Sequence, residues 1–323
     1  MKRSLLRVLT GLLISLITIA IMLGAGELYF RYGVLKSDSY DFTLMAKHWK
    51  EVCWNPLFTL HSDQYPNGIV QYRDRTWTDA DVQGKTKIMI IGDSFVAGHG
   101  VCNAKDRFGD LLQAKLGDQH YAVFNVAVNG WGTPEETYFP LLYPYKPDIV
   151  VLSYFVNDIR NAITITKHDY PNIIAPPDWL MNTPLKDSYL VDYVYWQIIY
   201  KRAFAASNSQ LWQALLDSYF VPDIWAEHKS EIQQVIDWSK KINAPLLVIT
   251  WPMLDNIDGS AKQIQEVEEV FKANNVPIIS GSDLYRNDPP DKIVVNNIDS
   301  HPNEYAHRKM ADALYSALQP YLK

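Results

Sequence analysis

Short apolar segments alternate with amphipathic helical segments along most of the chain, and this alternation constrains the fold most. The apolar segments are residues 87–91, 121–128, 148–155, 245–250 and 276–280. Helical spacing is present at 107–116, 134–145, 224–242, 260–273 and 303–322. Strands that are apolar throughout and joined by helices are typical of a parallel sheet with helices on both faces. The sequence therefore predicts a three-layer α/β/α domain, with any site at the carboxyl ends of the strands.

The N-terminus has the features of a membrane-spanning segment. Three basic residues within the first seven positions precede an uncharged stretch from Val8 to Gly26. As a helix this stretch is about 28 Å long, close to the roughly 30 Å hydrocarbon core of a bilayer. Basic residues before the stretch predict a cytoplasmic N-terminus, with the remainder on the periplasmic or extracellular side of the inner membrane. We expect residues 1–30 to be a transmembrane signal-anchor. A cleaved signal peptide ending near residues 24–26 is the alternative.

Two further segments depart from the strand–helix alternation. Residues 31–84 are polar, aromatic and contain prolines, and we expect an irregular membrane-proximal stalk that wraps onto the domain. Residues 160–223 are rich in Tyr and Trp and are predicted to be a helical insertion within the domain at 85–323. We expect this insertion to be a helical layer that packs on the sheet, since aromatic residues at helical spacing usually pack. A lid or a wall that binds the acyl acceptor is the alternative.

Composition excludes several classes of protein. The net charge is −6, from 30 basic and 36 acidic residues, and no long basic run is present, which argues against nucleic acid as a partner. The two cysteines exclude a disulfide-rich scaffold. The histidines are scattered without ligand spacing, so we expect no metal or other cofactor. If the chain is exported, Cys53 and Cys102 either form a disulfide or remain unpaired.

Four short segments of polar residues or glycine follow predicted strands or precede the last helix. Gly92-Asp93-Ser94 follows the first strand, Gly130 the second, and Asn157-Asp158 the third. Asp299 and His301 lie just before the terminal helix. Each segment alone is consistent with an ordinary turn or cap. Together they supply a serine, a histidine, a carboxylate and hydrogen-bond donors, which are the groups of an activated nucleophile.

In order and spacing these segments resemble the SGNH hydrolases, also called the GDSL esterase/lipase family. The resemblance covers roughly residues 85–323 and implies a flavodoxin-like arrangement of the sheet. It implies that Ser94 is the nucleophile, His301 the general base and Asp299 the group that orients His301. It also implies an oxyanion hole formed by the backbone N–H groups of Ser94 and Gly130 and the side-chain amide of Asn157.

Two positions depart from the family pattern. Phe155 stands where the family has a glycine before the asparagine, and the acid lies two residues before the histidine where the family has three. Either a changed loop brings Asp299 to His301, or a backbone carbonyl orients His301 in its place. Among the other histidines, His99 alone is a candidate to line the site, but we expect it to be an exposed loop residue.

The resemblance implies a serine esterase that cleaves an acyl ester through an acyl-enzyme. Expected substrates are small-molecule, polysaccharide or lipid esters at the cell envelope, such as O-acetylated carbohydrate. The same residues serve an O-acyltransferase if a sugar hydroxyl replaces water. A catalytically silent glycan- or protein-binding domain is a further alternative, because function belongs to the site and not to the fold.

Overall fold

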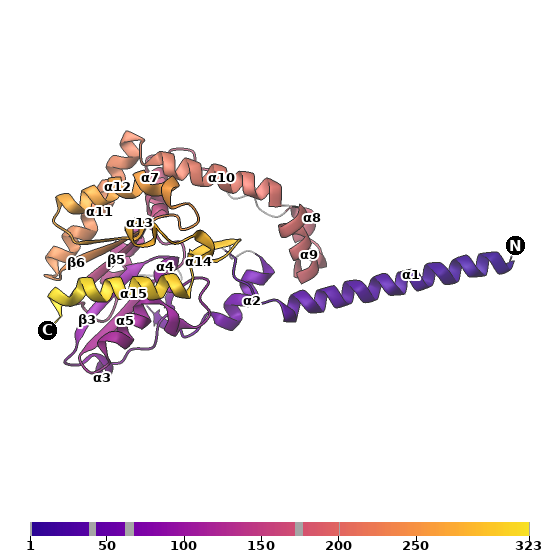
Figure 1. Cartoon of the computed structure of the whole chain (residues 1–323), viewed down its shortest axis with the longest axis horizontal. Helices are drawn as coiled ribbons and strands as arrows, with labels where there is room; N and C mark the ends of the chain where they lie inside the picture. The colour runs from indigo at the N-terminus through magenta and orange to yellow at the C-terminus, as the bar shows by residue number, and fades with distance from the viewer. Residues whose placement is uncertain (1, 39–42, 62–67, 172–176, 200, 323) are drawn as a thin grey trace. The chain divides into compact units, whose positions relative to one another are not determined.

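The computed structural model (Figure 1) describes residues 2–38, 43–61, 68–171, 177–199 and 201–322. The chain divides into two compact units. One consists of residues 1–51 and 173–208, and the other of residues 52–172 and 209–323. We call them the N-terminal unit and, because it contains the predicted residues Ser94 and His301, the catalytic unit, and we describe each by itself.

A five-stranded parallel sheet forms the centre of the catalytic unit. The strands lie in the order β4-β3-β5-β6-β7. Their bounds are β3 Thr86–Gly92, β4 Tyr121–Ala127, β5 Ile149–Phe155, β6 Leu246–Trp251 and β7 Ile278–Ser280. Every residue of β4, β5 and β6 is buried, as expected for apolar strands covered on both faces. When these five strands are numbered 1 to 5 in chain order, their spatial order is 2-1-3-4-5, which is that of flavodoxin-like sheets. The prediction of a flavodoxin-like α/β fold is therefore confirmed.

Helices cover both faces of the sheet. On one face α5 (Phe108–Leu116) packs against the terminal helix α15 (Glu304–Leu318). A second group comprises α6 (Thr133–Tyr138), α7 (Arg160–Ile165) and α11 (Pro222–Lys241), and α11 packs against the other two. Helix α12 (Ile257–Ala273) connects β6 to β7. The shorter elements are α4 Ser94–Ala97, α13 Gly281–Tyr285, α14 Pro290–Ile293, β8 Val294–Asn296 and β9 Asp299–Pro302.

The segment expected to be irregular contains regular structure. It holds helix α2 (Leu44–Cys53), the antiparallel strands β1 (Phe58–His61) and β2 (Ile69–Tyr72), and helix α3 (Asp79–Val82). Tyr72 and Trp77 are buried in the core of the catalytic unit, and the Trp77 ring meets Phe124 of β4 edge-on at 5.0 Å. The prediction of irregular structure was wrong. The sequence of this segment has no helical or strand periodicity, and its aromatic residues are ordered by packing on the sheet edge.

The insertion between β5 and β6 is divided between the two units. Its last part, the end of α10 (Lys201–Ser218) and the following turn, buries Leu215 and Tyr219 in the core of the catalytic unit. Its first part belongs to the N-terminal unit and contains α8 (Asp178–Met181) and α9 (Tyr189–Tyr193). Residues 172–176 and 200 of the insertion lie outside the described residues.

Helix α1 (Lys2–Leu28), with its continuation Tyr29–Gly33, is the remaining element of the N-terminal unit. Residues Leu6–Gly33 are long and apolar enough to cross a membrane, a test that a signal sequence also passes. Within the described residues this is the single helix with that property.

Candidate active site

Ser94 lies at the carboxyl end of β3, an interior strand of the sheet, as the first residue of α4. Asp93 caps this short helix, and its Oδ1 accepts a hydrogen bond from the Phe95 N–H at 2.9 Å. Gly92 allows the close approach of α4 to the sheet. A Cβ there would lie 2.6 Å from Val96 Cγ2 and 3.0 Å from the Ser153 carbonyl oxygen. The backbone can therefore turn sharply at the end of the strand and present the Ser94 hydroxyl at the sheet edge.

Asp299 and His301 both lie on strand β9, which pairs with β8 in a short antiparallel hairpin. Residues two apart in a strand point to the same side. Asp299 Oδ1 accepts hydrogen bonds from the His301 backbone N–H at 3.1 Å and from His301 Nδ1 at 2.6 Å. The strand, found where the sequence suggested a loop, explains how an acid two residues before the histidine reaches the imidazole.

The three side chains form one continuous hydrogen-bonded series. His301 Nε2 lies 2.8 Å from Ser94 Oγ, and the other ring nitrogen contacts Asp299. Asp299 is fully buried, whereas the His301 side chain is 15% exposed. An acceptor on Nδ1–H leaves Nε2 free to take the hydroxyl proton, which is the arrangement needed to activate a serine.

The two other predicted residues lie beside this series on the strands that flank β3. Asn157 follows β5, and its side-chain amide hydrogen-bonds to the Asp93 carboxyl, next to Ser94. Gly130 lies in the exposed turn after β4, with a φ of 78° that favours glycine. Its neighbour Asn129, not Gly130 itself, makes the described contact with the loop after Ser94. All the predicted residues therefore lie at one edge of the sheet.

The sequence matches the GDSL-like lipase/acylhydrolase family over residues 90–309, which is more than half of the chain. The chain belongs to this family. It is an ester-hydrolysing enzyme of the GDSL type. A comparison with curated protein sequences gives no match.

Several solved structures are similar to the chain. "TesA" is 14% identical, with a TM-score of 0.46 over 73% of this chain and 100% of its own. An acetyl xylan esterase is 18% identical, with a TM-score of 0.44 over 72% and 99%. A lipase/acylhydrolase from Enterococcus faecalis is 15% identical, with a TM-score of 0.42 over 74% and 97%.

A second histidine adjoins the acid of this GDSL hydrolase. His99 is 2% exposed, so the prediction of an exposed loop position was wrong. Its Nδ1 lies 2.8 Å from the Asn129 amide nitrogen, which can only donate, so the ring proton sits on Nε2. Nε2 faces Asp299 Oδ2 at 3.6 Å, and the ring lies 4.4 Å from the His301 ring, centroid to centroid. Asp299 is thus held between two imidazoles.

His99, Asp299 and His301 are also the described residues that could hold a metal ion, because their ligand atoms lie within 4.8 Å of one another. The atoms that would bind a metal are largely those already used between Asp299, His301 and Ser94. The hydrogen-bonded series accounts for their proximity, so we assign no metal to them.

Phe155, which replaces the usual glycine of the family, packs among aromatic rings. Its ring lies 4.3 Å from that of Phe95 and 5.9 Å from that of Trp212, centroid to centroid, and it is 8% exposed. Phe95 in turn lies 5.4 Å from the His301 ring. The bulky side chain therefore belongs to the packing that supports the imidazole.

Buried carboxyl groups lie behind the site. Burial raises the pKa of Asp93, and hydrogen bonds from Phe95 and Asn157 act against that rise. Burial, together with repulsion between the carboxyl groups, raises the pKa of Glu136 and of Asp158 well above the usual range. Burial and mutual repulsion thus both favour the neutral form of these two carboxyl groups.

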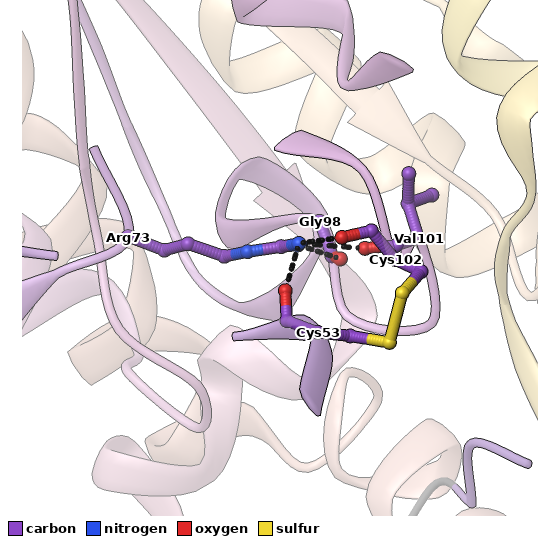
Figure 2. The surroundings of a disulfide bond; sticks show 5 residues. All are labelled: Cys53, Arg73, Gly98, Val101 and Cys102. Carbon is purple, nitrogen blue, oxygen red and sulfur yellow. Dashed lines mark hydrogen bonds between the residues drawn. A yellow bond between two sulfur atoms is a disulfide. The ribbon is translucent and has the colours of Figure 1, made fainter. Parts of the chain in front are cut away.

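The loop that carries His99 is clamped by a disulfide and a buried arginine (Figure 2). Cys53, at the end of α2, is bonded to Cys102. Figure 2 shows the Arg73 side chain reaching several carbonyl oxygens around this bond. The guanidinium donates to the carbonyls of Gly98, Cys53, Val101 and Cys102 at 2.7–2.9 Å and to that of Ala97 at 3.2 Å. Burial, and then repulsion by Arg107, lowers the pKa of Arg73 to about 9. The clamp fixes residues 97–102 beside the site.

Replacing both Cys53 and Cys102 by alanine should lower the free energy of unfolding of the catalytic unit by about 4 kcal/mol, because the bond closes a long loop of the unfolded chain. The two residues are 49 positions apart. Urea unfolding followed by tryptophan fluorescence measures the change. Reductant should shift wild type toward the double variant and leave the double variant unchanged. An unchanged midpoint in both would show that the bond contributes nothing to stability.

Proposed function

We propose that the chain is an exported, membrane-anchored serine esterase that hydrolyses carbohydrate O-acetyl or lipid esters of the cell envelope through an acyl-enzyme. The observation that carries this proposal is the continuous series from Ser94 Oγ through His301 to Asp299 at the carboxyl edge of the sheet. The apolar helix Leu6–Gly33 supports an anchor. The disulfide supports a location outside the reducing cytoplasm.

The proposed reaction has two acyl-transfer steps. Ser94 Oγ attacks the ester carbonyl carbon while its proton passes to His301 Nε2, and the carbonyl electron pair moves to the oxygen. As the intermediate collapses, the ester C–O bond breaks and the leaving alcohol takes the proton from His301. Water then gives a proton to His301, attacks the acyl group and releases the carboxylic acid, and the proton returns to Ser94. Asp299 stabilises the imidazolium in both steps.

The negative oxygen needs donors that are in place before the reaction. Three candidates come from adjacent strands: the N–H of Ser94 after β3, the N–H of Gly130 after β4 and the Asn157 amide after β5. Donors fixed at the position where charge develops lower the barrier without reorganisation. We assign the oxyanion hole to these three groups.

Asn157→Ala should lower kcat by about 100- to 1000-fold, the usual cost of losing one oxyanion donor. The variant should fold normally, since Asn157 is only partly buried. Steady-state kinetics on a chromogenic acetyl ester measure the effect, with the exposed Asn182→Ala as the matched control. A kcat equal to that of Asn182→Ala would remove Asn157 from the oxyanion hole.

His99 is proposed as a positioning residue for Asp299. His99→Phe keeps an aromatic ring but loses the N–H that faces the carboxylate, and should lower kcat about 10-fold with little change in KM. The acid limb of the kcat/KM profile should also move to higher pH. Without the His99 N–H, the charge of the Asp299 carboxylate acts more strongly on the His301 imidazolium, which then loses its proton less readily. His120→Phe, at an exposed position, is the control. A lower kcat with an unshifted acid limb would mean that His99 serves only packing.

Covalent labelling tests the proposed nucleophile without knowledge of the substrate. The full chain in detergent is treated with a fluorophosphonate probe beside Ser94→Ala. We expect labelling of wild type and complete loss of labelling in the variant. A well-folded wild-type chain that remains unlabelled would overturn the proposed mechanism. Product analysis with an acetyl donor, with and without a sugar acceptor, then separates hydrolysis from transfer to the sugar.

A further inference from the structure

We propose that residues 178–190, which we call the interface segment, lie on the membrane surface beside the exit of α1 and contact lipid through Trp179, Met181 and Leu185. This inference rests on the membrane anchor of the proposed function and extends it to a second membrane contact. It concerns the N-terminal unit alone.

Glu27, at the end of α1, holds the start of α9 through three hydrogen bonds. Its carboxylate accepts from Ser188 Oγ at 2.7 Å, from the Leu190 N–H at 3.0 Å and from the Tyr189 N–H at 3.2 Å. The same carboxylate also accepts from Arg31 at 2.6 and 3.0 Å. A residue more than 150 positions away in sequence thus satisfies free backbone donors of α9.

Packing contacts reinforce this docking. A Cβ added at Gly26 would lie 3.4 Å from both terminal carbons of Leu190, so the side chain of Leu190 rests directly on α1. The Phe30 ring stacks on Tyr193 at 4.2 Å, and the Arg31 guanidinium lies 4.6 Å above the Tyr189 ring. Arg31 also donates to the Asp187 carbonyl at 2.9 Å. The end of α1 and the interface segment therefore form one packed structure.

The position of Glu27 along α1 gives the depth of this contact. The uncharged residues Val8–Gly26 account for about 28 Å of helix, which fills the hydrocarbon core. Glu27 is the first charged residue after them and falls at the headgroup level. Whatever packs against Gly26 and Glu27 lies at that same level. The interface segment is therefore beside the outer boundary of the bilayer whenever α1 spans it.

The interface segment exposes apolar side chains that suit this boundary. Trp179 is 58% exposed, Met181 47% and Leu185 46%. On α1 and its continuation, Tyr29 and Tyr32 are 61% and 75% exposed at the same end. Trp and Tyr concentrate at the membrane interface, where an aromatic ring meets lipid and its polar atom meets water. Lys186 and Asp187 are exposed between the apolar residues, as in segments that lie on a membrane without entering it.

The test measures lipid contact at single positions of the full chain in lipid nanodiscs. One cysteine is introduced by Trp179→Cys or Leu185→Cys and labelled with an environment-sensitive fluorophore, while Cys53 and Cys102 stay paired. Leu16→Cys reports on the middle of α1, and Leu141→Cys is a matched exposed apolar position of the catalytic unit. Emission in acyl-brominated lipid is compared with emission in ordinary lipid.

We expect brominated lipid to remove about half of the emission at positions 179 and 185, more at position 16 and little at position 141. Adding Glu27→Ala should restore emission at 185 and leave position 16 quenched. Quenching at position 16 without quenching at positions 179 and 185 would disprove lipid contact by the interface segment and leave the proposed anchor intact. No quenching at 16 would overturn the anchor and with it this inference. Emission shifted to the blue at 179 or 185 without quenching would indicate a second copy of the chain in place of lipid.

Discussion

Replacing His301 by alanine is expected to lower kcat for ester hydrolysis by about 10⁶-fold, the scale on which serine–histidine pairs lose activity when either member is removed. The imidazole Nε2 lies 2.8 Å from Ser94 Oγ and has no substitute as proton acceptor in the proposed reaction. Because the two residues act as one unit, Ser94→Ala should cost a similar factor. The double variant should be no slower than either single variant.

The measurement is steady-state hydrolysis of a chromogenic acetyl ester. Independent preparations are compared so that activity from a contaminating esterase is recognised. His120→Ala, at an exposed position, controls for the handling of the protein. Additive losses in the double variant would contradict the shared mechanism. So would a His301→Ala variant that retains more than about one hundredth of the wild-type kcat.

Asp299→Asn should lower kcat by about 10⁴-fold, with the fold preserved. Asn and Asp have the same shape, but the amide can offer its N–H₂ to His301 Nδ1. The imidazole proton would then move to Nε2, and the nitrogen facing Ser94 could no longer accept the hydroxyl proton. The position of the acid two residues before the histidine makes this variant decisive, because the family pattern has its acid three residues before.

Two controls accompany this variant. Asp283→Asn changes a surface aspartate of the same unit, which pairs with Arg286 at an exposed position, and should leave kcat unchanged. Circular dichroism melting of Asp299→Asn should remain close to that of wild type. If the variant keeps nearly full activity in the folded state, a group other than Asp299 orients His301.

The parallel sheet and the residues at its edge could be predicted because their signals are local. The segments that became β3, β4 and β5 are continuously apolar, and each ends in the polar residues that reach the site. Chain order then placed Ser94, Gly130 and Asn157 on neighbouring strands. Burial on both faces of the sheet and short turns leave few other arrangements for such segments.

The features that the sequence did not predict depend on packing between distant segments. The β8–β9 hairpin is short and β9 is polar, so the strand that aligns Asp299 with His301 has no apolar alternation to reveal it. His99 lies in a loop, and its burial follows from contacts with Asn129 and β9 that no local pattern encodes. The disulfide was one of two open alternatives, because sequence does not give the distance between Cys53 and Cys102.

The chain passes between its two units three times, after residues 51, 172 and 208. A protease that cut once between α1 and the catalytic unit would leave that unit covalently joined to the insertion. The insertion itself is held on α1 by the Glu27 hydrogen bonds and the Phe30–Tyr193 stack. If α1 spans a membrane as proposed, shedding of the enzyme needs three cleavages, one after α1 and one at each end of the insertion, or one cleavage together with release of the insertion from α1. In that case the protein resists loss by proteolysis better than one tethered by a single linker.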